Sequence, residues 1–181
     1  MKIYPYLSLM LLALSISQSL AGEIKSGLSD KEKESPLIQW GTESQEMQVS
    51  ISVKDETKKF TTNEPIALIV RFKNLSTNAC YIPVRRVFSE NDHFLFSIIA
   101  PSGKDISPVF HRVYYAGSGI NVCVPPKQVE GFEFDLNDIC EMDETGTYKI
   151  ILKVKKRVSG SNKLAEVVSN RLYVSILPAQ K

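Results

Sequence analysis

No nucleophilic side chain in this sequence has the surroundings of a catalytic motif. Ser118 lies in AGSGI, but the nucleophile elbow of hydrolases is G-x-S-x-G at a strand-to-helix turn, and Ala116 stands where its first glycine belongs. Cys123 or Cys140 could pair with His111 as thiol and base, although nothing in their spacing brings them together. We therefore predict that the protein is not an enzyme and needs no cofactor.

Metal-ligating side chains are similarly scattered. The three cysteines and two histidines lack the short C-x-x-C spacing of structural zinc sites. Oxygen ligands for calcium gather in one stretch, but their spacing matches no calcium-binding loop, so we favour a solvated acidic turn. The acidic residues of this stretch are Asp135, Asp138, Glu141, Asp143 and Glu144.

The first residues predict export. Lys2 is followed by an apolar run over residues 7–20, and Ser19 and Ala21 are the small residues of a signal-peptide cleavage site. A membrane anchor is the alternative, but polar residues interrupt the run, which is shorter than the roughly 20 apolar residues that span a bilayer. We expect residues 1–21 to be a signal peptide, the mature chain to have no membrane span, and the location to be periplasmic or secreted.

Length and charge limit the possible partners. Removal of residues 1–21 from 181 leaves 160, which is enough for one domain with its own core. The formal net charge of +2 falls to +1 with the loss of Lys2, too little to attract nucleic acid in general. We expect no nucleic-acid partner, and we interpret the basic cluster at residues 153–157 as the solvated face and end of a strand.

Residues 22–46 are polar and charged, with little periodicity. This composition predicts a flexible leader before a domain at residues 47–181. The exception is PLIQW, in which Leu37, Ile38 and Trp40 could dock on the domain as an added edge or could remain a linker. The sequence leaves both interpretations open.

From residue 47 onward, apolar and polar residues alternate in the pattern of half-buried strands. MQVSISVK places Met47, Val49, Ile51 and Val53 on one face, and PIALIVRFKN repeats the pattern over residues 66–72. Short strands of this kind continue to NRLYVSIL, separated by Gly, Pro, Asn and Asp turns, and no segment has a convincing helical period. We predict an all-β, antiparallel sandwich of about 7–9 strands.

The stretch DETGTYKIILKVKK narrows the fold class. Glu144, Gly146 and Tyr148 occupy alternate positions, as at the start of strand F in immunoglobulin-like sandwiches, where the tyrosine hydroxyl bonds back to the backbone. Two residues later, where antibody domains have a cysteine, this chain has Ile150. We predict an immunoglobulin-like corner without the antibody disulfide.

The succession NEPIALIVRFKNLS, PSGK, VCVPPK, ETGTYKI and SNRLYVSI resembles exported bacterial immunoglobulin-like domains. In layout it is similar to the intracellular proteinase inhibitor (BsuPI-type) domains, and more distantly to macroglobulin-type sandwich domains, over residues 47–177. The resemblance implies the sandwich fold and makes proteinase inhibition one possible activity. It carries over no inhibitory residue, because its motifs occur in sandwiches of many functions.

Three cysteines in an oxidising compartment leave at least one without an intramolecular partner. We predict a disulfide between Cys80 and Cys123, because both flank loops at one end of the predicted sandwich. Cys140 lies near the opposite end and is predicted to be free or available for an intermolecular bond.

Binding is the function that remains, and loops on a rigid scaffold usually provide it. Segments 85–93 and 111–119 contain the arginines and aromatic residues typical of interaction hot spots, although these aromatics could equally be buried at a strand edge. The candidate partner-binding residues are Arg85, Arg86, Phe88, His111, Arg112, Tyr114 and Tyr115. We predict a non-enzymatic module that binds a protein or envelope partner, with a proteinase inhibitor and a carbohydrate-binding module as alternatives.

Overall fold

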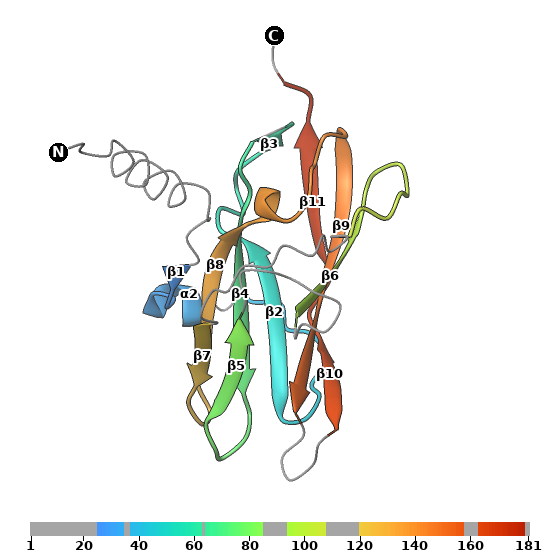
Figure 1. Ribbon diagram of the computed structural model, residues 1–181. Coiled ribbons are helices and arrows are strands. Elements are labelled where there is room, and N and C mark those ends of the chain that lie inside the picture. The colour runs from blue at the N-terminus through green and yellow to red at the C-terminus, as the bar shows by residue number, and fades with distance from the viewer. Residues whose placement is uncertain are drawn as a thin grey trace, which may run out of the picture.

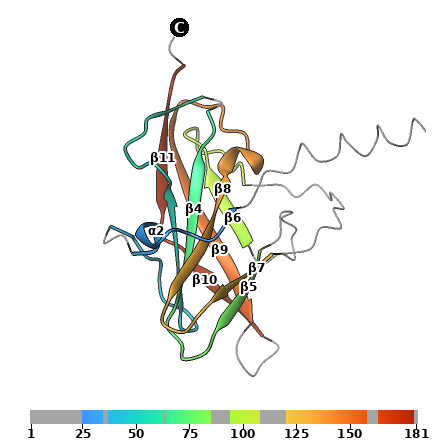
Figure 2. The ribbon, with the colours of Figure 1, turned by 90° about the vertical axis from the view of Figure 1, so that its left-hand side faces the viewer.

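The computed structural model describes residues 25–34, 37–62, 64–84, 94–107, 120–157 and 163–179. Two β-sheets pack face to face, and a two-stranded ribbon lies beside them (Figures 1 and 2). No helix in the described ranges is long and apolar enough to cross a membrane.

The first sheet, which we call sheet A, has four antiparallel strands. In order across the sheet they are β1 (Lys25–Ser26), β8 (Val129–Asp135), β4 (Ala67–Asn74) and β2 (Met47–Val53). Val70 of β4 lies opposite both Ile51 and Phe132. Since side chains directly opposite each other share a face, this register places all three on the side that faces the second sheet.

The second sheet, sheet B, is built around β9. Its strands are β6 (Phe94–Ile99), β9 (Gly146–Arg157), β10 (Leu164–Val168), β11 (Leu172–Leu177) and β3 (Phe60–Thr61). β6 pairs with one edge of β9, β10 and β11 pair in succession with its other edge, and β3 runs parallel to the end of β11. Residues 169–171 oppose only Ile151 and Leu152, so a bulge separates β10 from β11.

The bulge also joins the two sheets. The Asn170 side chain accepts from the Ile51 N–H at 2.8 Å and donates to the Ile51 carbonyl at 3.0 Å. On the same edge of β2, the Gly41 N–H donates to the Val49 carbonyl. Asn170 and Gly41 therefore occupy N–H and carbonyl groups on the free edge of β2. A further strand could otherwise form hydrogen bonds with these groups.

The ribbon consists of β5 (Cys80–Val84) and β7 (Ile120–Val124), which fold back from the ends of β4 and β8 (Figures 1 and 2). Asn74, which is fully buried, holds the bend. Its amide donates to the carbonyls of Asn78 and Val124, and its carbonyl oxygen accepts from the N–H and the hydroxyl of Ser76. All four hydrogen-bonding positions of this amide are thus occupied.

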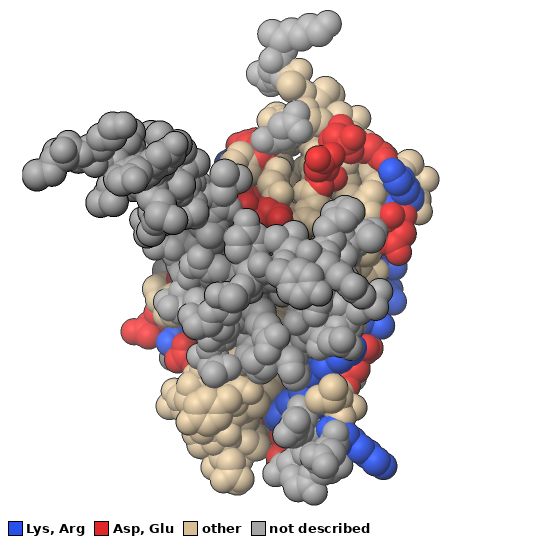
Figure 3. Space-filling model, viewed as in Figure 1, with Lys and Arg blue, Asp and Glu red and all other residues tan. Residues whose placement is uncertain are grey.

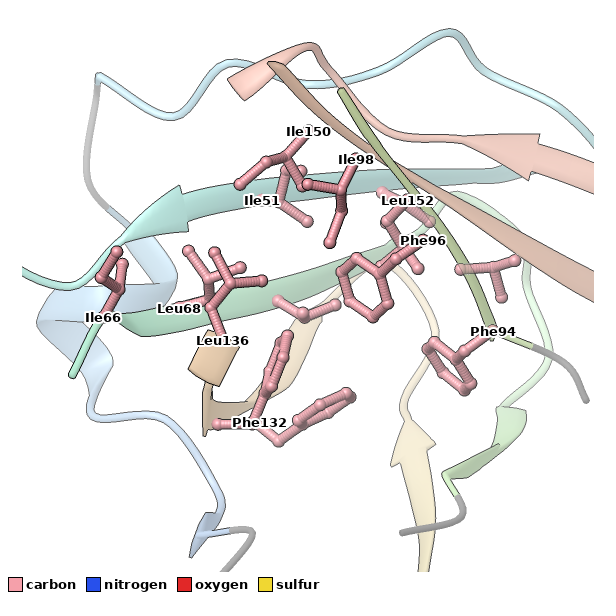
Figure 4. Close-up of a cluster of buried hydrophobic side chains, with 14 of the residues drawn as sticks. Ile51, Ile66, Leu68, Phe94, Phe96, Ile98, Phe132, Leu136, Ile150 and Leu152 are labelled. Atoms are coloured by element: carbon pink, nitrogen blue, oxygen red, sulfur yellow. The ribbon is translucent and has the colours of Figure 1, made fainter. Parts of the chain in front are cut away.

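The core fills the space between sheets A and B (Figure 4). Phe94 of sheet B meets Phe72 and Phe132 of sheet A edge to face, with ring centroids 5.9 and 6.0 Å apart. The predicted inward residues in and next to β2, β4 and β9 are buried, apart from Val53, which is partly buried, and this confirms the alternation. The buried ones are Met47, Val49, Ile51, Ile66, Leu68, Val70, Phe72, Ile150, Leu152 and Val154.

The corner before β9 has the geometry that the sequence predicted. Tyr148 is fully buried, and its hydroxyl donates to the Glu144 carbonyl at 3.0 Å and accepts from the Glu144 N–H at 2.8 Å. The Glu144 carboxylate accepts from the N–H and the hydroxyl of Ser102. Gly146 has φ +128°, and a Cβ there would lie 2.7 Å from Pro101. The three alternate residues therefore fasten the corner to the PSGK turn.

Tyr148→Phe should lower the free energy of unfolding by about 1 kcal/mol, and by more if the buried Glu144 backbone groups find no water. Burial raises the pKa of the Tyr148 hydroxyl, so it remains a donor at neutral pH. Urea unfolding of the two proteins measures the difference. Equal stability would mean that the corner hydrogen bonds contribute nothing to the fold.

The segment predicted as a flexible leader makes ordered contacts where it is described. β1 pairs with β8, Leu28 is buried above Gly131, and α2 (Asp30–Glu34) follows. The Glu32 carboxylate accepts from the N–H and the hydroxyl of Ser29, which is one half of a capping box. Residues 25–34, which we call the N-terminal strap, thus pack on sheet A, contrary to the expectation of flexibility.

A buried arginine fixes the strap. Arg71, on the outward face of β4, donates from Nε to the Glu32 carbonyl at 2.6 Å and from Nη1 to the Ser52 hydroxyl at 2.8 Å. Lys33 of the strap pairs with Glu130 of β8 at 2.7 Å. Single contacts of this kind leave no periodic signal in the sequence, which is why composition alone suggested a leader.

The fold is an all-β, immunoglobulin-like sandwich, as predicted. Eleven strand segments lie in the described ranges, more than the 7–9 expected, because β1 and β3 have two residues each and bends or bulges divide longer strands. The sequence interpretation missed β10 as well as β1 and β3. The remaining regular elements are α2 and a 3-10 turn at Leu136–Asp138, capped by Asp135.

Candidate functional site

Catalytic and metal-binding candidates do not assemble into a site in the part of the chain that is described. Ser118 and His111 lie outside it. No group of three or more metal-ligating side chains is found among the described residues. In the acidic stretch, Asp135 accepts hydrogen bonds from the Ile66 and Asn137 N–H groups, which gives its carboxylate a structural role.

The predicted disulfide between Cys80 and Cys123 is wrong, since both are free cysteines in the structure. They do lie on neighbouring strands, but Cys80 is opposite Val124 and Cys123 is opposite Tyr81. Successive residues of a strand point to opposite faces, so Cys80 is buried in the core while Cys123 is exposed. The two thiols are kept apart because the register of β5 and β7 puts them on opposite faces of the ribbon.

Cys140 forms no disulfide within this chain. Its thiol lies 3.7 Å from the Leu136 carbonyl, and burial raises its pKa to about 12. Burial also raises the pKa of the Cys80 thiol. The three cysteines should therefore differ widely in reactivity, because the thiolate is the nucleophile.

Brief alkylation of the folded protein at pH 8 should modify Cys123 first, with Cys80 and Cys140 reacting only on the timescale of opening or unfolding. Peptide mass spectrometry over time gives the three rates, and alkylation in urea provides the control in which all three become accessible. Equal rates in the folded protein would contradict the burial of Cys80 and the partial burial of Cys140.

The seven candidate partner-binding residues at positions 85–88 and 111–115 lie outside the described residues. The ends of their segments are nevertheless placed. Val84, the last residue of β5, is opposite Ile120, the first residue of β7. Segment 85–93 therefore starts beside the point where segment 111–119 ends, although the two are far apart in sequence.

Between these segments and the bend, the ribbon has an exposed and uncharged face. Tyr81 is 67 % exposed and lies opposite Cys123, whose hydrogen bond raises the pKa of the Tyr81 hydroxyl. The sequences NLSTNACYIPV and INVCVPP contain no charged residue. The molecule is accordingly tan over the bend of β5 and β7 in Figure 3.

Sequence reasoning missed Tyr81, which we now include with the ends of β5 and β7 in the candidate site. The signal was available, because an uncharged run with a tyrosine, next to two segments that contain arginine and aromatic residues, is unusual on a protein surface. Tyr81 was overlooked because the sequence CYIPV was interpreted as an ordinary buried strand.

Trp40 docks on the domain, which the sequence had left open. The Lys73 ammonium lies 5.7 Å from the centre of its ring, and the indole is partly buried. Among the described residues, the large exposed aromatics are Tyr81 on the ribbon and Tyr173 on sheet B. They lie on different sheets, so these residues form no flat aromatic row of the kind that carbohydrate modules use.

Comparisons with known proteins return no match to a protein-family model and no match among curated proteins. There is thus no sequence support for the BsuPI-type likeness. Among solved structures, the C-terminal domain of wzt is 12 % identical, with TM-score 0.44, covering 81 % of each chain. The ASH/PapD-like domain 7 of human CEP192 is 14 % identical, with TM-score 0.39, covering 84 % of this chain and 99 % of its own.

An enzyme also appears among the structural neighbours. A family 123 glycoside hydrolase from Clostridium perfringens is 9 % identical, with TM-score 0.34, and the match covers 74 % of this chain but 28 % of the hydrolase. Likeness this distant carries no functional conclusion. The assignment to the immunoglobulin-like sandwiches therefore depends on the chain's own strand pairing and on the Tyr148 corner.

Proposed function

We propose that the protein is an exported, non-enzymatic module that binds a protein or envelope partner. Binding takes place at a surface that we call the ribbon surface, made of segments 85–93 and 111–119 and the outward face of β5 and β7. The observation that carries the proposal is the pairing of Val84, from which segment 85–93 departs, with Ile120, to which segment 111–119 leads.

The residue types at the ribbon surface support this proposal. Arginine and tyrosine dominate binding energies at protein interfaces, and the centre of an interface is depleted of charge. Segments 85–93 and 111–119 together contain arginines and tyrosines. The strands β5 and β7 beside them contain no charged residue and carry the exposed Tyr81. Proteinase inhibition and carbohydrate binding gain no comparable support from the described residues.

Export belongs to the proposal and is tested separately. The apolar run at residues 7–20 and the small residues before Gly22 are its basis. N-terminal sequencing of protein recovered outside the cytoplasm should begin at or next to Gly22. Recovery of intact Met1 from the cytoplasm would remove the export part and leave the ribbon surface untouched.

Binding is tested with paired alanine variants. The chain captures a partner from an envelope extract of its source cells, and binding to that purified partner is then measured by calorimetry. Arg85→Ala with Arg86→Ala, or Tyr114→Ala with Tyr115→Ala, should weaken binding at least about tenfold, because hot-spot residues typically contribute more than about 1 kcal/mol each.

The matched control is Arg171→Ala with Tyr173→Ala, which removes one arginine and one tyrosine from the exposed side of sheet B. This variant should bind the partner at full strength. If the folded double variants at positions 85–86 and 114–115 also bind at full strength, the ribbon surface is not the binding site. A turnover that is lost in His111→Ala or Cys123→Ala would instead show an enzyme.

A further inference from the structure

The outward face of sheet B combines lysines with apolar side chains. Ile150, Leu152 and Val154 of β9 point into the core, so the alternate residues of this strand point outward. We call this outward side the lysine face. Its members include Lys149, Ile151, Lys153 and Lys155 of β9, Leu95 and Ile99 of β6, and Arg171 and Tyr173 at the other edge.

The pairing of the strands mixes the two kinds of side chain. Lys149 lies opposite Ile99 on one side and Tyr173 on the other. Lys153 lies opposite Leu95 and Val168. Each of these lysines is therefore flanked by apolar groups on both sides, so its aliphatic stem has apolar neighbours while its ammonium can reach outward.

Acidic residues are fewer on this face. Glu166 pairs with Lys153 at 3.2 Å, and Asp105 lies at the β6 edge, where its carboxylate accepts from the Ser107 N–H. The main acidic stretch, residues 135–144, is instead at the corner before β9. Blue atoms recur along the right margin of Figure 3, with red atoms between them. The lysine face is thus cationic in a molecule that is nearly neutral.

The placement of charge differs from that of a protein–protein interface. Such interfaces have an apolar centre, a polar rim and few lysines. Here the lysines follow β9, which is the central strand, and the most exposed apolar residues lie at the β10–β11 edge. These are Tyr173 at 60 %, Leu164 at 53 % and Leu177 at 43 % exposure.

We propose that the lysine face binds the headgroup region of an anionic lipid bilayer. Lysine ammonium groups on flexible stems suit a diffuse layer of phosphates, which presents no fixed geometry to match. The aliphatic side chains and Tyr173 enter the boundary between headgroups and acyl chains, where amphipathic aromatic rings are favoured. The face lies on sheet B and is independent of the ribbon surface.

The test is sedimentation with phosphatidylglycerol–phosphatidylcholine vesicles and with pure phosphatidylcholine vesicles. The protein is purified after export, and its N-terminus is read by mass spectrometry, because an uncleaved apolar run would bind vesicles by itself. We expect binding to the anionic vesicles only, and weaker binding as salt rises, because surface charge interactions are screened.

The lysines are tested as a set. Lys149→Gln, Lys153→Gln and Lys155→Gln together should lower the vesicle partition coefficient about a hundredfold, because each basic residue near an anionic surface contributes about fivefold. The control is Lys54→Gln, Lys73→Gln and Lys127→Gln, which removes the same charge outside sheet B and should bind like the parent. Melting temperatures establish that both variants are folded.

Three outcomes would overturn the proposal. Equal binding to anionic and neutral vesicles would show that charge is not the cause. Equal losses in the two triple variants would show that net charge matters and the lysine face does not. Salt-sensitive binding to soluble polyglutamate, lost in the Lys149/153/155 variant but without vesicle binding, would identify an acidic protein as the occupant.

Discussion

Asn74→Asp should lower the free energy of unfolding by about 3 kcal/mol or more. The wild-type amide donates to the carbonyls of Asn78 and Val124 at 2.7 and 2.9 Å, in a position with no exposure to solvent. A carboxylate there would turn two attractive contacts into repulsive ones and would be buried without a counter-charge, and each buried unsatisfied group costs about 1–3 kcal/mol. Urea unfolding at neutral pH measures the loss.

The loss should depend on pH in a defined direction. The folded state disfavours the charged form of the new carboxyl, so folding raises its pKa above the unfolded value. The destabilisation is then full at neutral pH and shrinks in acid, where the carboxyl is protonated in both states. Asn78→Asp is the matched control, since its side chain is exposed and only its backbone carbonyl holds Asn74. If both variants lose the same small amount, Asn74 does not hold the bend.

Gly131→Ala is the second change with a large expected effect, about 3 kcal/mol. A Cβ at this position of β8 would lie 2.0 Å from the Val70 carbonyl oxygen and 2.8 Å from Leu28 Cδ1. The first contact is with backbone of the neighbouring strand, so β4 and β8 must separate, and overpacking of this kind costs about 1–3 kcal/mol before hydrogen bonds are lost. The second contact should displace the N-terminal strap.

Thermal unfolding gives the stability of Gly131→Ala, and hydrogen exchange of residues 25–34 reports the strap. Gly103→Ala is the control, because Gly103 has φ +85° but open space around its Cβ position. Backbone strain alone should cost this control about 1–2 kcal/mol and leave the strap protected. Equal effects in the two variants, with the strap protected in both, would contradict the packing of Leu28 on Gly131.

Regular alternation was the part of the fold that could be predicted from the sequence. Successive residues of a strand point to opposite faces, so the alternating apolar residues Met47, Val49 and Ile51 could be predicted to share the buried face. Tyr148 could be recognised because the residues of its corner have a fixed local spacing. β10 was missed because its burial does not alternate strongly. Leu164 is 53 % exposed, and Val167 is its fully buried residue.

Features set by long-range register could not be predicted. Cys80 and Cys123 were predicted to flank loops at one end of the sandwich, and the structure pairs their strands. A shift of one residue decides whether two side chains on paired strands share a face, and no local pattern fixes that shift. Asn74 looked like an ordinary turn residue in NLSTN, since its bond to Val124 spans 50 positions. The contact of Arg71 with the strap is likewise a single bond to a backbone carbonyl.

The central claim, binding at the ribbon surface, is tested most directly by photocrosslinking in cells that export the protein. A photoreactive phenylalanine derivative replaces either Tyr81, which is 67 % exposed on the ribbon, or Tyr173, which is 60 % exposed on sheet B. The account predicts that the probe at position 81 forms a crosslink to a discrete protein or envelope component, and that the probe at position 173 does not crosslink to that component. The same component crosslinked from position 173, with none from position 81, would contradict it.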